Sequence, residues 1–143
     1  MNIFSKKEGS AGAFNLLPVM LTIFLGAIIL INFSIQIRYL DIVNKIENLA
    51  GRYMLIMETE NGLTLDDRNQ LNAELCSLGI NIKDIDYAGT TFYDDRVNYG
   101  DEIYLRMKIA VPYSVMSIGN NMKADIKAEK RQVVIEKCAL ALG

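Results

Sequence analysis

The sequence predicts an α+β protein with a long N-terminal helix, a short second helix and an antiparallel sheet of three to four strands. Three observations support this prediction. Residues 9–37 carry no charge and are mostly apolar, which is typical of a helix in a membrane. Over 38–62 the apolar residues recur every three or four positions, as on one face of a helix. From Ile103 to Tyr113 apolar and polar residues alternate, which predicts a strand with one buried face.

The first helix begins as a predicted transmembrane span over 13–37. At about 1.5 Å per residue this segment is roughly 37 Å long, enough to cross a hydrocarbon core of about 30 Å. A secretory signal peptide has a shorter apolar region and a small-residue cleavage site, and residues 35–38 (IQIR) offer no such site. We therefore expect a retained single-pass anchor. Lys6 and Lys7 favour a cytoplasmic location for the leader, residues 1–12, so the rest of the chain is expected outside the cytoplasm.

An amphipathic extension of the same helix is predicted over 38–62. Its polar face carries charged and amide side chains, and its other face is free to pack on a sheet. Asn61-Gly62 is the predicted stop. The apolar positions are Leu40, Val43, Ile46, Leu49, Ala50, Tyr53, Met54 and Met57.

The remaining segment, 63–143, is predicted to form an extracytoplasmic α+β domain. It opens with a short helix that has Thr64 as its N-cap, acidic residues in its first turn and a stop at Gly79. Its apolar stripe consists of Leu71, Leu75 and Leu78.

Strands are predicted after this helix. Alternation over 80–87 changes parity near Lys83-Asp84, which predicts a bulge at that point. The strand from Ile103 is expected to end near Pro112, because proline suits a strand end or an edge. Residues 114–123 are expected to form a loop, and a last strand is expected over 128–142.

Composition excludes several function classes. The chain carries 15 basic and 17 acidic residues, and its outer part is weakly acidic, so the basic surface of a nucleic-acid-binding protein is missing. There is no histidine, which removes the usual general base and the commonest metal ligand. We therefore expect a non-enzymatic protein without a cofactor or a bound metal.

Two further features leave alternatives open. Cys76 and Cys138 are either a disulfide pair, which typically stabilises by about 2–4 kcal/mol, or two separate buried thiols. The acidic, tyrosine-rich segment 84–102 is either a set of solvated turns and strand ends or an oxygen-rich calcium site, although no twelve-residue calcium loop fits it.

Small and polar residues inside the span predict lateral association with another membrane helix, since such residues are the usual contacts between helices in lipid. The alternative is that Thr22 and Ser34 bond to their own backbone while Asn15, Asn32 and Gln36 lie near the headgroups. The candidate association residues are Asn15, Pro18, Thr22, Gly26 and Ala27.

The leader KKEGSAGAF, followed by an uninterrupted apolar helix, resembles the leader of prepilins. The order of residues 9–14 (GSAGAF), with Pro18 deeper in the span, is most similar to the TadE-like family of minor pseudopilins in tight-adherence (Flp-type) pili. Later segments agree with this family in outline. They are Gly100-Asp101-Glu102 before the alternating strand, Val111-Pro112-Tyr113 at its end and the charged residues Glu129, Lys130 and Arg131 before the last strand.

The resemblance implies a pilin-like fold and cleavage of the leader by a membrane prepilin peptidase. The candidate cut lies between Gly9 and Ser10, with Gly12 as the other glycine at which a cut is considered. The family places a glutamate five positions after the cut, whereas this chain has Phe14 there, or Leu17 if the cut follows Gly12. This departure suggests a divergent relative of the clostridial type.

The function expected from the sequence is that of a minor pseudopilin anchored in the cell membrane. Such a protein would be a structural or initiating subunit of a tight-adherence pilus or of a related secretion apparatus. Its expected partners are the membrane, other pilin subunits through the first helix, and the prepilin peptidase. The alternative is a single-pass membrane protein whose small extracellular domain binds or senses a ligand without entering a filament.

Overall fold

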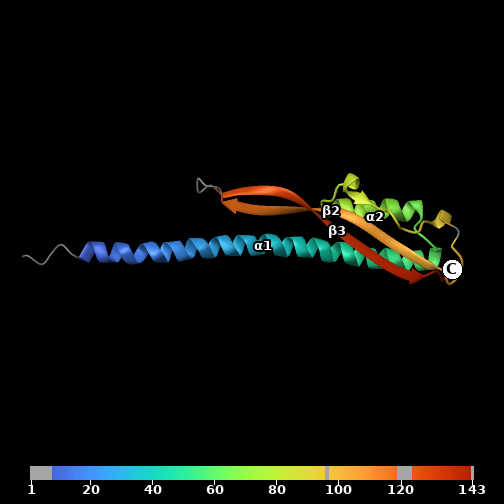
Figure 1. The fold of residues 1–143 in the computed structure, drawn as a ribbon, viewed down its shortest axis with the longest axis horizontal. Helices are drawn as coiled ribbons and strands as arrows, with labels where there is room; N and C mark the ends of the chain where they lie inside the picture. Colours follow the sequence, from blue (N-terminus) through green and yellow to red (C-terminus); the bar gives the residue numbers. More distant parts are fainter. Residues whose placement is uncertain (1–7, 96, 119–123, 143) are drawn as a thin grey trace, which may run out of the picture. The chain divides into compact units, whose positions relative to one another are not determined.

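The computed structural model of the protein describes residues 8–95, 97–118 and 124–142, and within these ranges it describes all side chains except those of 8–15, 118 and 124. It confirms the predicted α+β layout: a long helix, a short helix and a three-stranded antiparallel sheet (Figure 1). The elements in chain order are α1 (Glu8–Glu60), α2 (Leu65–Ser77), the 3₁₀ turn η1 (Ile82–Asp84), β1 (Ile85–Asp86), the 3₁₀ turn η2 (Tyr93–Asp95), β2 (Glu102–Ile118) and β3 (Ala124–Leu140).

The chain divides into two units, one that ends at Gln36 and one that begins at Ile37. Helix α1 belongs to both, with Pro18 inside the first part. It ends where the sequence predicts, because Asn61 takes the left-handed φ of 60° and the chain leaves the helix there.

The core of the second unit begins with the amphipathic half of α1. Most of the predicted stripe is confirmed, but Leu40 is 56% exposed and lies outside it. Tyr39 and Ile42 pack against the core instead, because at about 100° per residue Leu40 is turned away from the line that they share with Ile46. The buried residues of α1 are Ile46, Ala50, Tyr53, Met54 and Met57.

Helix α2 has the predicted start, stripe and stop. The backbone N–H of Asp67 donates to the hydroxyl of Thr64 at 3.2 Å, so Thr64 is the N-cap. Leu71 and Leu75 are fully buried. Gly79 follows the helix with a φ of 85°, a conformation that suits glycine.

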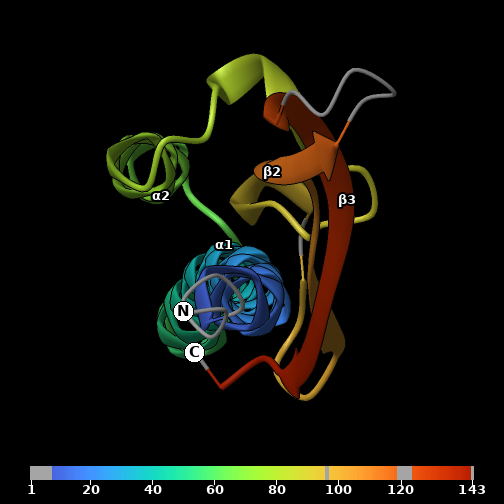
Figure 2. The same ribbon diagram turned by 90° about the vertical axis from the view of Figure 1, so that its left-hand side faces the viewer.

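The sheet has the strand order β1-β2-β3, and both pairs of strands are antiparallel. Its inner face meets α2 and the second half of α1, which lie on the same side of it (Figure 2). The predicted alternation is confirmed, because every second residue of β2 in this region has no exposed surface: Ile103, Leu105, Met107, Ile109 and Val111. These side chains are the centre of the core.

The hairpin of β2 and β3 is longer than predicted. Strand β2 continues to Ile118 and β3 begins at Ala124, so the predicted loop is wrong for 114–118; residues 119–123 lie outside the described part of the chain. Pro112 is inside β2 and opposite Lys130. It is tolerated because β1 extends only as far as Ile109, so the missing N–H of Pro112 faces an unpaired edge.

The strand predicted over 80–87 is confirmed only at Ile85 and Asp86, and the predicted bulge is wrong. The side chain of Asn81 accepts a hydrogen bond from the backbone N–H of Lys83 at 3.1 Å and caps the 3₁₀ turn η1. Only two residues, Ile85 and Asp86, then pair with β2. A local cap thus takes the place of the first part of a strand.

Candidate functional site: an apolar helix and its outer domain

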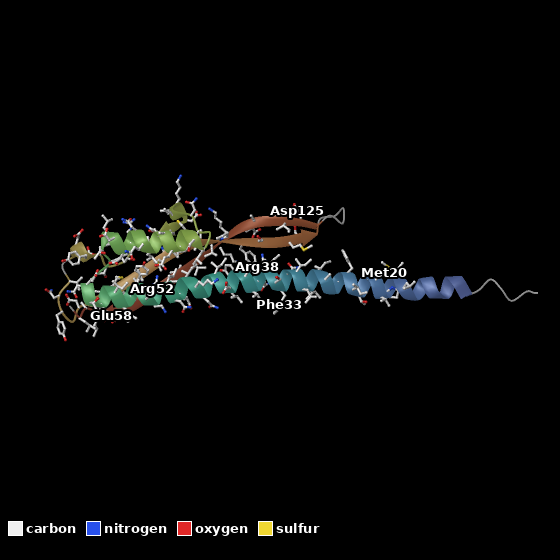
Figure 3. The ribbon with its side chains drawn as sticks, turned by 180° about the vertical axis from the view of Figure 1, so that it is seen from behind. Met20, Phe33, Arg38, Arg52, Glu58 and Asp125 are labelled. Atoms are coloured by element: carbon white, nitrogen blue, oxygen red, sulfur yellow. The ribbon has the colours of Figure 1, made fainter. Side chains whose placement is uncertain are left out.

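The first part of α1 presents apolar side chains to the solvent. Leu17 and Leu30 are exposed to 71% and 69%, and Met20 and Phe33 also project from the helix (Figure 3). Between Leu16 and Glu60 an 18-residue window is apolar enough to cross a membrane, and none of that window is buried. This lack of burial separates it from the core helix of a water-soluble domain. The helix is therefore suited to lipid, where apolar side chains have no cost of exposure.

Two polar side chains of this segment bond to their own helix. The hydroxyl of Thr22 donates to the carbonyl of Val19 at 2.8 Å, and the amide of Asn32 donates to the carbonyl of Ile28 at 3.1 Å. Lipid offers no partner for such groups, so these bonds lower the cost of placing them in a bilayer. The self-bonding alternative from the sequence is correct for Thr22, and Asn32 behaves in the same way.

The candidate association residues gather on one side of α1. Pro18, Thr22 and Gly26 are spaced by four positions, so they share a face, and Ala27 is next to it. A Cβ placed on Gly26 would meet no atom within 4 Å, so the space beside this glycine is open. Asn15 is in the helix, but its side chain lies outside the described set. The arrangement allows close approach of a second helix.

The candidate cleavage residues Gly9 and Ser10 lie in the first turn of α1, and their side chains are outside the described set. Lys6 and Lys7 are outside the described residues altogether.

A cluster of three side chains connects α1 to α2 within the second unit, which begins at Ile37. The guanidinium of Arg52 donates to both carboxylate oxygens of Glu74, and the hydroxyl of Tyr53 donates to one of them at 3.0 Å. The hydrogen bond from Arg52 lowers the pKa of Glu74. Burial, followed by the bond to Glu74, raises the pKa of Tyr53. The charges are satisfied within the cluster, as expected for a structural contact.

An open hollow of about 430 Å³ lies beside this cluster. Both cationic side chains that line the hollow are already paired. Arg52 bonds to the carboxylate of Glu74, and Lys45 bonds to that of Asp41. Within 8–95, 97–118 and 124–142 no three His, Cys, Asp or Glu side chains are grouped as a metal site. The lining residues are Lys45, Asn48, Leu49, Arg52, Glu74, Ser77 and Leu78.

The acidic segment 84–102 uses its carboxylates to close turns. Asp86, Asp95 and Asp101 each accept a hydrogen bond from a backbone N–H two or three residues away, at 3.0, 2.7 and 2.9 Å. The aspartates therefore act as local caps, which fits turns rather than a shared cation site.

Cys76 and Cys138 are free and exposed. The bridge considered from the sequence is not formed in this structure, and the other alternative, two buried thiols, is wrong. Cys76 is on α2, and Cys138 is on the outer face of β3 opposite Tyr104.

A contact that sequence reasoning missed holds the hairpin to α1. The rings of Tyr39 and Tyr113 meet edge to face, with centroids 5.3 Å apart. The guanidinium of Arg131 lies 4.3 Å from the centroid of Tyr113 and 5.7 Å from that of Tyr39. These geometries favour aromatic pairing and a cation–π contact. Three elements far apart in the sequence supply the residues, so no local pattern indicates them.

A search of known protein families, curated proteins and solved structures finds no match to this chain. Its functional interpretation therefore depends on the features described above and on the resemblance of its leader and span to those of pseudopilins.

Proposed function

We propose that this protein is a minor pseudopilin anchored in the cell membrane, with its N-terminus in the cytoplasm and its α+β domain outside. It acts as a structural or initiating subunit of a tight-adherence pilus or a related secretion apparatus. One observation carries the proposal: α1 is a single helix whose first part is apolar and exposed and whose last part forms the core of a small domain. The resemblance of the leader to prepilins supports the pilin assignment.

In this proposal the first part of α1 has two environments. In the membrane its apolar side chains contact lipid. During assembly they exchange lipid for the apolar helices of neighbouring subunits, with the face of Pro18, Thr22 and Gly26 as the closest contact. The self-bonded Thr22 and Asn32 suit both environments, because neither needs a partner in lipid.

The first test is the N-terminus of the protein purified from its native membrane. A pseudopilin cut after Gly9 begins at Ser10. The Gly9→Leu variant should remain uncut, whereas Gly12→Leu serves as the matched control and should be cut normally. A wild-type protein that retains Met1 or begins at Asn2 contradicts the proposal and indicates a plain anchor.

A second test is the side of the membrane on which the domain lies. Cys76 and Cys138 are both exposed, so a membrane-impermeant maleimide added to intact cells should label them. Ser5→Cys, in a Gly9→Leu chain that keeps its leader and has both native cysteines changed to serine, should be labelled only after the cells are opened. Labelling in the reverse order contradicts the proposed orientation.

The alternative is a single-pass binding or sensor protein that never assembles. Two observations favour it: Thr22 and Asn32 of the span bond to their own helix, and an open hollow lies between α1 and α2. Oxidation of a Gly26→Cys variant in native membranes separates the two functions. A pseudopilin should cross-link through this face, with Phe24→Cys on the opposite face of the helix as the control, and a sensor that stays monomeric should not.

A further inference from the structure

Strand β3 is at the edge of the sheet, and its outer edge is unpaired along the part of the chain that the structure describes. The backbone groups of Tyr104 and Arg106 bond to Thr90 and Thr91, on the side away from β3. In an antiparallel ladder these directions alternate, so the residues opposite them, Cys138 and Glu136, turn their N–H and C=O groups outward. The same holds for every second residue of β3.

Such an edge is a template for another strand, and many proteins block it with charges or with a short strand. Strand β3 is 17 residues long. It also exposes three large apolar side chains on its outer face: Ile126 at 64%, Val134 at 56% and Leu140 at 52%. Its charged side chains are of both signs, so whether they oppose or favour pairing depends on the partner strand and on the register.

We propose that two copies of this chain pair through the outer edges of β3, antiparallel, with Val133 opposite Val133 of the second copy. This register places Ile126 opposite Leu140 of the second copy. It also places Glu129 opposite Lys137 and Lys130 opposite Glu136, and each of these contacts occurs twice because the pair has two-fold symmetry. In these three pairs apolar residues meet apolar residues and charges meet opposite charges, which stabilises directly opposed pairs in a sheet. Arg131 lies opposite Ile135 and gains no such partner.

The charges select this register over its neighbours. A slide of one strand by two residues keeps the same faces together, so only charge and size decide between these registers. A slide in one direction places Lys127 opposite Lys137, and a slide in the other direction places Arg131 opposite Lys137. Like charges directly opposite each other destabilise a sheet. The self-complementary register is therefore favoured among those that use nearly the whole strand.

The existing ion pairs fit the proposed interface. Lys130 bonds to Asp84 at 2.6 Å, and Arg106 bonds to Glu136 at 2.6 Å, both on the outer face. Across the interface, Lys130 of one copy meets Glu136 of the other, which makes a row of four charges of alternating sign. Glu129 and Lys137 have no ion pair within the residues that the structure describes, and the interface supplies one for each.

The pairing fixes where the second unit of each copy begins. At one end of β3, Glu129 is opposite Tyr113, which packs on Tyr39 near the start of this unit. At the other end, the N–H of Leu142 donates to the carbonyl of Glu58 at the end of α1. Antiparallel pairing therefore directs the Ile37 ends of the two copies to opposite ends of the pair.

A disulfide at the two-fold axis tests the register. Val133 bonds to β2, so the pair of Val133 residues across the interface is of the non-hydrogen-bonded type, with Cα atoms about 4.5 Å apart, within disulfide range. The full chain in detergent micelles, with both native cysteines changed to serine, should form a dimer on oxidation when it carries Val133→Cys. The matched control is Val134→Cys, which is more exposed but too far from its copy to bridge. Equal yields from the two variants would overturn the proposal.

A charge exchange tests the interface without a covalent bond. Glu129→Lys places like charges at both equivalent sites and should weaken the dimer on the order of tenfold. The double variant Glu129→Lys/Lys137→Glu restores opposite charges in the second copy and should recover the affinity. Circular dichroism checks that each variant is folded. A double variant no tighter than the single one, with both folded, contradicts the pairing.

Discussion

Gly62 is the position at which a single methyl group should damage this domain most. Its φ is 148°, and a Cβ placed there would lie 2.6 Å from the carbonyl carbon of Phe92. The overlap is with backbone, which cannot rotate away as a side chain would. The backbone of Phe92 is held in place because Leu63 donates to Thr91 at 3.0 Å and Tyr93 donates to Leu63 at 3.2 Å.

The size of the effect follows from these contacts. An alanine in such a backbone conformation costs roughly 1–3 kcal/mol. Relief of the overlap requires the loss of the two hydrogen bonds around Leu63, each with a net contribution of about 1 kcal/mol. We therefore expect Gly62→Ala to lower the free energy of unfolding by about 3–5 kcal/mol. For a domain of this size, that is a fall in melting temperature of about 10 °C or more.

The matched control is Gly51→Ala, eleven positions earlier in the chain. Gly51 is inside α1, and a Cβ there meets no atom within 4 Å. Alanine is a better helix former than glycine, so this variant should be more stable by up to about 1 kcal/mol. Urea unfolding of the full chain in detergent, followed by circular dichroism, measures both. A Gly62→Ala protein within about 0.5 kcal/mol of wild type would refute the reasoning.

Three further predictions concern the core and the titrating groups. Met107→Ala should lower the free energy of unfolding by about 2–5 kcal/mol because Met107 is fully buried, while the exposed neighbour Lys108→Ala should change it by less than about 0.5 kcal/mol, both measured by urea unfolding. Burial raises the pKa of Tyr87 from 10.0 to about 12, so the folded chain holds this proton more tightly. Stability should then fall as the pH rises from about 10 to about 12, and less so in Tyr87→Phe, as melting temperatures across this range will show. The bond from Arg52 lowers the pKa of Glu74 below its ordinary 4.5. The ionised carboxylate therefore stabilises the fold above that pH, and this stability is lost as the pH falls through the pKa of the folded state. In Glu74→Gln the melting temperature should fall less steeply across this acidic range.

The parts of the fold that the sequence predicts correctly depend on local signals. The Thr64 cap, the Asn61-Gly62 stop and the alternation from Ile103 to Val111 each combine a short pattern with burial. The hairpin beyond Tyr113 has little buried surface. It is held by the backbone ladder between β2 and β3, so the hydrophobic pattern does not reveal its length.

In the candidate site, too, local features can be predicted from the sequence and long-range contacts cannot. The apolar span is a property of one continuous segment, so its place could be predicted. The contacts that position the hairpin depend on Tyr39, Tyr113 and Arg131, which the sequence separates widely. The sequence places Leu40 in the apolar stripe because it lies three residues before Val43. The structure leaves Leu40 exposed, because the packed sheet decides which side of α1 is covered.

The order in which the core is made has a consequence for biosynthesis. Ile46 and Met57 are synthesised early, but β2 and β3, which help to bury them, are synthesised last. Until then the nascent chain carries an uncovered apolar stripe beside its apolar N-terminal segment, a state that invites aggregation and chaperone binding. A premature stop codon before Ile103 would make this state permanent, and the truncated product should be cleared by proteases rather than accumulate.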